Sequence, residues 1–280
     1  MNAFDAILHF FKGQMPAPGN YGWFHLLSLA VIVATTVFLC IKFRDCSDQI
    51  FRRILLIGWI LLIVLEVYKQ ISYVGFHGEP GSYKWEYQWY AFPYQFCSTQ
   101  HYVLPFIIFC KPGKVRSACM AFMTTFALFA GVAVCLYPND VFVSQTGINI
   151  QTMVHHGAQV VFGIYIAVYN RHRFNMKWYL SSLPVFGVMV AVAMLLNGLI
   201  PMWIGNDQTF NMFYVSWRYP STLPVLNLLY QDVAAPTLPY PVFLLVYLVG
   251  FAIAALAVFG IVFGLIKLSL RLMKKKKQPA

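Results

Sequence analysis

Charged side chains are scarce in this 280-residue sequence, and acidic ones are the scarcest. Asp, Glu, Lys and Arg make up 10% of the chain, whereas hydrophobic residues make up 60%. Soluble domains carry roughly 25% charged residues, so this composition excludes an ordinary water-soluble domain. The sequence therefore predicts an integral membrane protein.

Patterned cysteines are also missing. The chain has 6 cysteines, and no Cys-x-x-Cys occurs among them. Most fall within or at the ends of apolar segments: Cys40, Cys97, Cys110, Cys119 and Cys135. This spacing argues against a disulfide framework, a redox motif or a structural zinc site, so we expect no metal and no cofactor.

The chain shows no break in composition, no low-complexity segment and no obvious internal repeat. We therefore expect residues 1–280 to form a single membrane domain. Residues 201–240 are rich in proline and cannot form a straight span, so we expect an outer loop that covers the bundle. Phe4, Leu8 and Phe11 recur at helical spacing and predict a short interfacial helix near the N-terminus.

Seven apolar stretches are long enough to cross a bilayer as helices. A helix that rises about 1.5 Å per residue needs about 18 or more apolar residues to cross a hydrocarbon core about 30 Å thick. The alternating pattern of a membrane barrel is absent. The predicted spans are residues 22–43, 54–75, 92–110, 117–137, 151–169, 178–200 and 241–267. The sequence thus predicts an all-α, polytopic seven-transmembrane-helix bundle.

The basic residues lie mainly in alternate connections between these stretches. With the N-terminus outside, 16 of the 20 basic residues face the cytoplasm, and the others are Lys12, Lys69, Lys84 and Arg218. This asymmetry is the one that the positive-inside rule requires. We therefore expect a cytoplasmic C-terminus, in a plasma membrane or a bacterial inner membrane. The tail lysines Lys274 to Lys277 are expected to contact anionic lipids, and no nucleic acid is expected as a partner.

Polar side chains within the spans are costly, so their positions indicate functional sites. In the predicted orientation they gather in the outer half of the membrane. The candidates from the spans and the loop after residue 200 are Glu66, Lys69, Gln70, Gln95, Cys97, Gln100, His101, Gln151, His155, His156, Gln159, Asn197, Asn211, Tyr214 and Arg218. We expect these residues to converge on one polar pocket in contact with membrane lipids.

A thiol and an imidazole are expected at equal depth in this pocket. Cys97 and His156 each lie about five residues into an inward-running helix, which places both roughly 8 Å below the outer boundary. A neighbouring histidine can take the proton of a thiol and donate it later, and a lipid acyl ester is the natural electrophile in this leaflet. Gln95, Asn211 or Arg218 are candidates to stabilise a developing oxyanion.

Other interpretations remain open at this point. A cysteine in a span is often a small buried apolar residue, and a histidine at the end of a span is often interfacial. A transporter or channel could use Glu66 and Lys69, although the inner halves of the spans offer no continuous polar route. A haem or metal site could use His101 with His155 or His156. A non-catalytic membrane protein is also compatible with the sequence.

The sequence resembles the family that joins YwaF-type bacterial integral membrane proteins with the animal transmembrane protein 164. The resemblance covers about 150 residues, from the third to the seventh span. Its motifs are Pro93-Tyr94-Gln95-Phe96-Cys97-Ser98 with Leu104-Pro105-Phe106, His156-Gly157 with Gln151 and Tyr165, and Asn197 with Asn211, Tyr214 and Pro239-Tyr240-Pro241.

The resemblance implies a seven-span bundle and a cysteine-dependent acyltransferase acting on ether-linked lysophospholipids. Cys97 would be the nucleophile and His156 its base. The animal protein is also similar in fold to androgen-induced-protein hydrolases, which pair a threonine with a histidine. A second histidine, His155, adjoins the expected one here, so both imidazoles are candidates. We predict a membrane acyltransferase or acyl hydrolase with Cys97, His156 and His155 at its centre.

Overall fold

A computed structural model describes residues 3–79, 81–138, 141–205, 207–223 and 225–275, with side chains up to residue 272. The predicted contacts of Lys274 to Lys277 with lipid therefore lie outside the described side chains. Pro224 of the proline-rich segment is outside the described residues as well.

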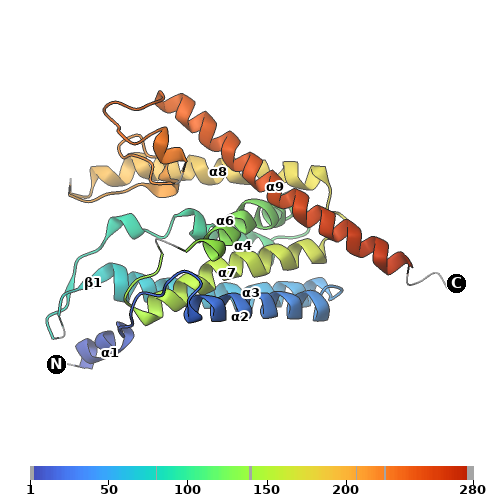
Figure 1. Cartoon of the computed structure of the whole chain (residues 1–280), viewed down its shortest axis with the longest axis horizontal. Coiled ribbons are helices and arrows are strands. Elements are labelled where there is room, and N and C mark those ends of the chain that lie inside the picture. The colour runs from blue at the N-terminus through green and yellow to red at the C-terminus, as the bar shows by residue number, and fades with distance from the viewer. Residues whose placement is uncertain (1–2, 80, 139–140, 206, 224, 276–280) are drawn as a thin grey trace.

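The described chain is predominantly helical, in agreement with the predicted all-α class (Figure 1). The α-helices are α1 (Ala3–Phe11), α2 (Trp23–Lys42), α3 (Asp48–Lys69), α4 (Thr99–Phe109), α5 (Lys114–Phe122), α6 (Leu128–Leu136), α7 (Thr146–Tyr169), α8 (Met176–Leu199) and α9 (Tyr240–Lys275). One π-helical segment, η1 (Gln70–Gly75), continues α3, and another, η4 (Met123–Ala127), joins α5 to α6. Two short antiparallel strands, β1 (Phe76–His77) and β2 (Lys84–Trp85), form a hairpin.

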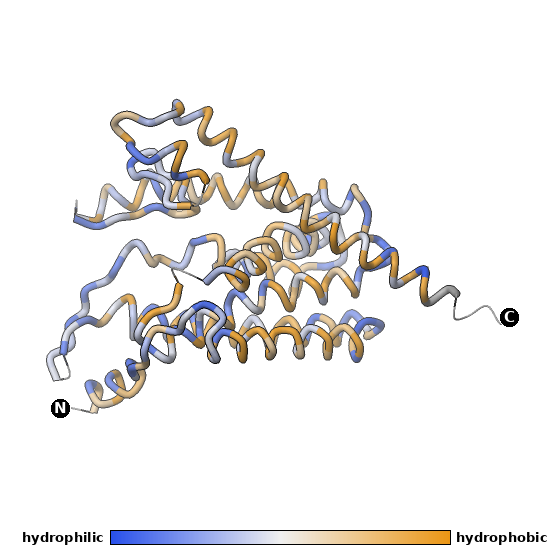
Figure 2. The backbone as a smooth tube through the Cα atoms, in the orientation of Figure 1, coloured by the Kyte–Doolittle hydropathy of each residue, from blue (hydrophilic) through white to orange (hydrophobic). Residues whose placement is uncertain are grey.

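Four helices in the described part of the chain are long and apolar enough to cross a membrane. They are Trp23–Lys42, Lys114–Leu136, Met176–Met202 and Tyr240–Leu272. Hydrophobic positions follow the long helices in Figure 2, and hydrophilic ones concentrate in the connections at both ends. These features are those of an α-helical integral membrane protein.

The third predicted span is shorter than residues 92–110. Helical structure there runs from Phe96 to Phe109, because Gln95 is extended with φ −86° and ψ 169°. Pro93, which lacks a backbone N–H, precedes it. The N-terminus of this helix therefore lies next to irregular chain that covers one end of the bundle.

Helix α7 occupies the centre of the bundle. It buries 15 of its 24 residues, including polar ones, whereas α2 buries only four of its 20. A side chain that is costly in lipid can be accommodated where protein surrounds it. The central position of α7 thus explains how a helix rich in amide and imidazole groups is accommodated in a membrane protein.

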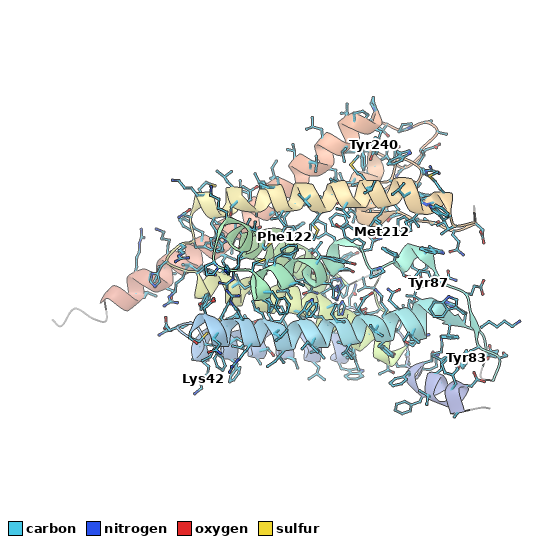
Figure 3. All side chains as sticks on the ribbon, turned by 180° about the vertical axis from the view of Figure 1, so that it is seen from behind. Lys42, Tyr83, Tyr87, Phe122, Met212 and Tyr240 are labelled. Carbon is cyan, nitrogen blue, oxygen red and sulfur yellow. The ribbon has the colours of Figure 1, made fainter. Side chains whose placement is uncertain are left out.

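The irregular segments gather at one end of the bundle. In Figure 3, Tyr83, Tyr87, Met212 and Tyr240 lie at this end, and Lys42 lies at the opposite one. The predicted N-terminal helix is present as α1, which packs Phe4 against Phe76 with ring centroids 5.1 Å apart.

Three basic connections meet at the end of the bundle that carries Lys42. Arg171, after α7, donates to the carbonyl oxygen of Arg44 at 3.1 Å and pairs with Asp45. Arg116 on α5 pairs with Asp48 at 2.6 Å, and Arg52 pairs with the same carboxylate at 2.7 Å. The predicted cytoplasmic loops therefore share one end of the bundle.

We expect Asp48→Asn to lower thermal stability more than Asp45→Asn does. The carboxylate of Asp48 pairs with the buried Arg116, whereas the Asp45 side chain is 61% exposed and that of its partner Arg44 is 48% exposed. Partial burial raises the pKa of Asp48, but its hydrogen bonds with Arg116 and Arg52 outweigh that effect and lower it overall. We expect losses of about 1–2 kcal/mol for Asp48→Asn and less than about 1 kcal/mol for Asp45→Asn.

Thermal unfolding in detergent micelles measures both effects. Because the pKa of Asp48 is lowered in the folded protein, its contribution is present above the ordinary aspartate value of about 3.9 and is lost as the pH falls further. The difference between wild type and Asp48→Asn should therefore shrink on acidification below that value. Equal losses for the two variants at pH 7 would contradict the ranking.

Candidate functional site

Cys97 lies in the first turn of the helix that enters the bundle from the irregular end. The 3-10 turn Phe96–Ser98 precedes α4 directly. Cys97 is half-buried, and its Sγ lies 4.0 Å from the hydroxyl oxygen of Ser98. The partial positive charge at the N-terminal end of a helix favours negative charge on this sulfur, whereas burial of the sulfur opposes it.

Two glutamine side chains connect this turn to α7. Gln159 donates from Nε2 to the carbonyl oxygen of Phe96 at 3.4 Å. Gln100 donates to the carbonyl oxygen of His155 at 2.8 Å and reaches that of Cys97 at 3.4 Å. Cys97 is therefore held beside the turn of α7 that begins at His155.

His156 is oriented so that one ring nitrogen remains available. Its Nδ1 lies 2.8 Å from the carbonyl oxygen of Thr152, which can only accept a hydrogen bond. The neutral ring therefore carries its proton on Nδ1 and its lone pair on Nε2. Both Cys97 and His156 are described, and no hydrogen bond joins them in this arrangement.

His155 points to different partners from those of His156. Its Nε2 lies 3.2 Å from the carbonyl oxygen of Leu62, and its Nδ1 lies 3.7 Å from Oε2 of Glu66. Successive residues of an α-helix are rotated by about 100°, so the two adjacent histidines serve different faces of α7. The structure thus separates the surroundings of the two imidazoles, both of which the sequence left as candidate bases.

Glu66 is a buried carboxylate surrounded by donors. Oε1 receives bonds from Lys69 and Gln70 at 2.7 Å each. Oε2 lies 3.4 Å from Nε2 of Gln151 and faces His155. The cost of burying this charge is offset by the ion pair and the amide donors.

His101 completes a cluster with Glu66 and His155. Its Nδ1 lies 2.9 Å from the carbonyl oxygen of Ser98, and its ring centroid is 4.9 Å from that of His155. Within the described residues, Nε2 of His101 is buried without a hydrogen-bond partner. The structure therefore brings three of the predicted site residues together on α3, α4 and α7.

Gln95 connects the Cys97 turn to the segment between α8 and α9. Its Nε2 donates to the carbonyl oxygen of Asn211, and its Oε1 accepts from the backbone N–H of Phe213, both at 3.1 Å. Phe213 and Tyr214 have positive φ values of 56° and 57°, a strained conformation for residues other than glycine. The side chain of Gln95 thus holds a strained turn against the start of α4.

The two predicted asparagines stabilise the same segment. Asn197 accepts from the backbone N–H of Met212 at 2.7 Å and donates to its carbonyl oxygen at 3.0 Å. Asn211 accepts from the backbone N–H of Ser216 at 2.9 Å and donates to the carbonyl oxygen of Pro220 at 3.2 Å. These contacts position the segment between α8 and α9, and the place of both residues in a functional polar pocket remains a prediction.

The remaining predicted residues differ in their surroundings. Tyr214 is half-buried in the strained turn. Arg218 is exposed, and its backbone N–H bonds the hydroxyl of Ser216 at 3.1 Å. Among the described residues, no hydrogen bond or ion pair joins Arg218 to the buried cluster around Glu66, and the oxyanion role predicted for Arg218 remains a prediction.

A supporting residue of the cluster was not predicted from the sequence. Tyr87 donates its hydroxyl to Oε1 of Gln70 at 2.6 Å, which orients that amide toward Glu66. Gln70 itself follows Glu66 by four residues, a spacing that places both on one helical face. Tyr87 lies in irregular chain, where no periodicity indicates which residues meet.

A helical bundle with long apolar helices around a buried polar cluster places this chain in the class of integral membrane proteins. The sequence was also compared with family models, and the TMEM164 family model matches residues 20–263. The chain therefore belongs to the TMEM164 family, and the resemblance found in the sequence is confirmed at that level. Neither the curated proteins nor the solved structures gave a match.

Gly131 on α6 lets α7 approach closely at the candidate site. A Cβ atom at this position would lie 2.7 Å from both the carbonyl oxygen of His156 and Cβ of Gln159. We expect Gly131→Ala to displace this turn of α7 and to cost about 1–3 kcal/mol of stability, as overpacking does. Thermal unfolding in detergent measures the effect.

Gly187→Ala on α8 is the matched control. No atom lies within 4 Å of the position of its Cβ, so alanine should be neutral or stabilise the helix by up to about 1 kcal/mol. Equal tolerance of both substitutions would show that the packing of α6 against α7 is not tight.

Proposed function

We propose that this protein is a membrane acyltransferase or acyl hydrolase in which Cys97 attacks the acyl ester of a lipid. The observation that carries the proposal is the attachment of the Cys97 turn to α7 by Gln100 and Gln159. The attachment holds a thiol at a helix N-terminus beside the helical turn that carries His156. The proposal requires the nucleophile and the base, which come from separate helices, to be neighbours in the complex with substrate.

His156 is the base in this proposal. Its Nδ1 is fixed on the carbonyl of Thr152, which leaves the lone pair of Nε2 to accept a proton. His155 directs its nitrogens to Leu62 and Glu66 instead. Catalytic hydrogen bonds are often long in a ligand-free site, so the missing bond between Cys97 and His156 is expected to form when substrate binds.

The proposed reaction has two balanced halves. His156 Nε2 takes the thiol proton while the sulfur attacks the ester carbonyl carbon, and the proton then passes to the departing lysolipid oxygen as the C–O bond breaks. The acyl group remains on Cys97 as a thioester. A second lysolipid hydroxyl, or water, then attacks the thioester, and its proton moves through His156 back to the sulfur.

Backbone N–H groups at the start of the helix are the proposed oxyanion donors. The amide of Gln95 is engaged on both sides by Asn211 and Phe213, and Asn211 is engaged by Ser216 and Pro220. The N–H groups of Ser98 and Thr99 are bonded to the carbonyl oxygens of Gln95 and Phe96, so the proposed donors are the preceding N–H groups of Phe96 and Cys97 in the first turn of the helix. Cys97 lies in that turn, so a carbonyl attacked there lies within their reach.

We also propose seven spans with the Cys97 end outside. In this arrangement α3 with η1, the helix from Phe96 and α7 add three crossings to the four apolar helices. The clustering of Arg44, Arg116 and Arg171 at the opposite end supports a cytoplasmic assignment for that end. The substrate would then enter from the outer leaflet.

A lipid-like, thiol-reactive acyl probe tests the proposed nucleophile. We expect wild-type protein to be labelled on Cys97 and Cys97→Ser to lose the label. General-base assistance contributes about 10²–10⁴-fold, so His156→Ala should slow labelling by at least about 100-fold. The measurement is the labelling rate at each cysteine by mass spectrometry of peptides from the purified protein.

Cys110→Ser is the matched control, because Cys110 is also half-buried and lies at the other end of α4. This variant should label as wild type does. Uniform labelling of all cysteines, or a rate unaffected by His156→Ala, would overturn the assignment of nucleophile and base.

A membrane-impermeant maleimide tests the orientation. Ser82 lies exposed in the β1–β2 hairpin, and Lys111 lies exposed in the connection between α4 and α5. Each new cysteine is introduced into protein that already carries Cys46→Ser, and the reagent is added to whole cells. We expect Ser82→Cys to react directly and Lys111→Cys to react only after permeabilisation. The reverse pattern would place the Cys97 end in the cytoplasm.

A further inference from the structure

We propose that Glu66, His101 and His155 form a binding site for a divalent transition metal, with zinc as the first choice. Each residue offers one ligand atom, and these atoms all lie within 4.8 Å of one another. The residues come from α3, α4 and α7 and are 6%, 6% and 2% exposed. This inference stands on the cluster alone and does not depend on acyl transfer.

The hydrogen bonds of the two imidazoles leave their lone pairs for a ligand. The carbonyl of Ser98 fixes the proton of His101 on Nδ1, so its buried and unpartnered Nε2 carries the lone pair. The carbonyl of Leu62 fixes the proton of His155 on Nε2, so its Nδ1 carries the lone pair. That Nδ1 faces Oε2 of Glu66 at 3.7 Å.

Electron-rich atoms that face one another in a buried site repel each other unless a cation lies among them. Two neutral imidazole nitrogens and one carboxylate oxygen are such a set. Either a metal ion or a proton on one imidazole removes the repulsion. A metal accounts for all three atoms, whereas a proton between His155 and Glu66 leaves His101 Nε2 without a partner.

The surroundings of the cluster resemble the support that metal ligands receive. Ligating histidines usually donate their second nitrogen to a carboxylate or a backbone carbonyl, and ligating carboxylates are hydrogen-bonded themselves. Both imidazoles here meet the first condition, and Lys69, Gln70 and Gln151 supply the second for Glu66. The ligand atoms are thus oriented before any ion arrives.

The ligand set favours zinc over calcium or magnesium. Two histidines and one glutamate suit zinc and its neighbours, whereas calcium and magnesium prefer all-oxygen sites. Three protein ligands leave a fourth tetrahedral position open. Lys69 already balances the charge of Glu66, so an anion such as chloride or hydroxide is the fitting fourth ligand.

A metal at this position would stabilise the two helical turns that carry the candidate nucleophile and base. His101 is bonded to the carbonyl of Ser98, which follows Cys97, and His155 precedes His156. The ion would therefore join α3 to the two helical turns that carry these side chains. Its role in this proposal is to position them.

Metal analysis of the full-length protein, purified without chelators and then equilibrated with zinc and desalted, tests the site. We expect about one zinc per wild-type chain. His101→Ala and Glu66→Gln each remove a ligand and should weaken zinc binding by more than about tenfold. Substitution of residues that only support metal ligands already lowers metal affinity by about 10- to 100-fold. His156→Ala is the matched control and should retain the metal, because it changes the adjacent histidine on α7.

Cobalt substitution of wild-type protein keeps the test independent of folding in the variants. A tetrahedral site with histidine and carboxylate ligands should give visible absorption bands that zinc abolishes in competition. Wild-type protein that binds neither metal would overturn the proposal and assign the cluster to a shared proton. Zinc that persists in a monodisperse His101→Ala variant would overturn it too. Retention of zinc by a Cys97→Ser variant that no longer labels would support the site while separating it from the proposed catalysis.

Discussion

The cost of placing polar groups in lipid is the constraint on which this structure depends. The chain carries a row of amide, imidazole and carboxylate side chains within helices that are otherwise apolar. The structure accommodates them by placing α7 at the centre, with α2, α3, η4 and α6 packed around it. Glycines such as Gly131 permit the close approach that excludes lipid from this interior. The site is therefore a consequence of how the polar helix is enclosed.

The interior divides the polar residues into two adjoining groups with different chemistry. One is the proposed pair of Cys97 and His156, with a thiol at a helix N-terminus and an imidazole nitrogen that remains available. The other contains Glu66, His101 and His155, whose ligand atoms face one another. Backbone carbonyls set the tautomer in each group. The same pair of adjacent histidines thus serves both groups because their side chains leave α7 in different directions.

The segment between α8 and α9 is held in place by polar side chains in the described structure. Gln95, Asn197 and Asn211 hold its turn through paired contacts to backbone groups. Membership of the TMEM164 family places this arrangement in a known group of membrane proteins. The sequence motifs around Cys97 and Asn197 therefore belong to one structural unit, in which Gln95 joins them.

The sequence by itself determined the membrane class, the all-α fold and the approximate positions of the long helices. Lipid demands long apolar stretches with internally satisfied backbones, and such stretches are visible in one dimension. It also identified the polar residues, because each is an exception to an apolar pattern. Only the tertiary structure decided which of them meet, as it did for His101 with Glu66 and for Tyr87 with Gln70. Those contacts depend on helix rotation, on the late start of the third helix and on irregular chain, none of which hydrophobic periodicity specifies.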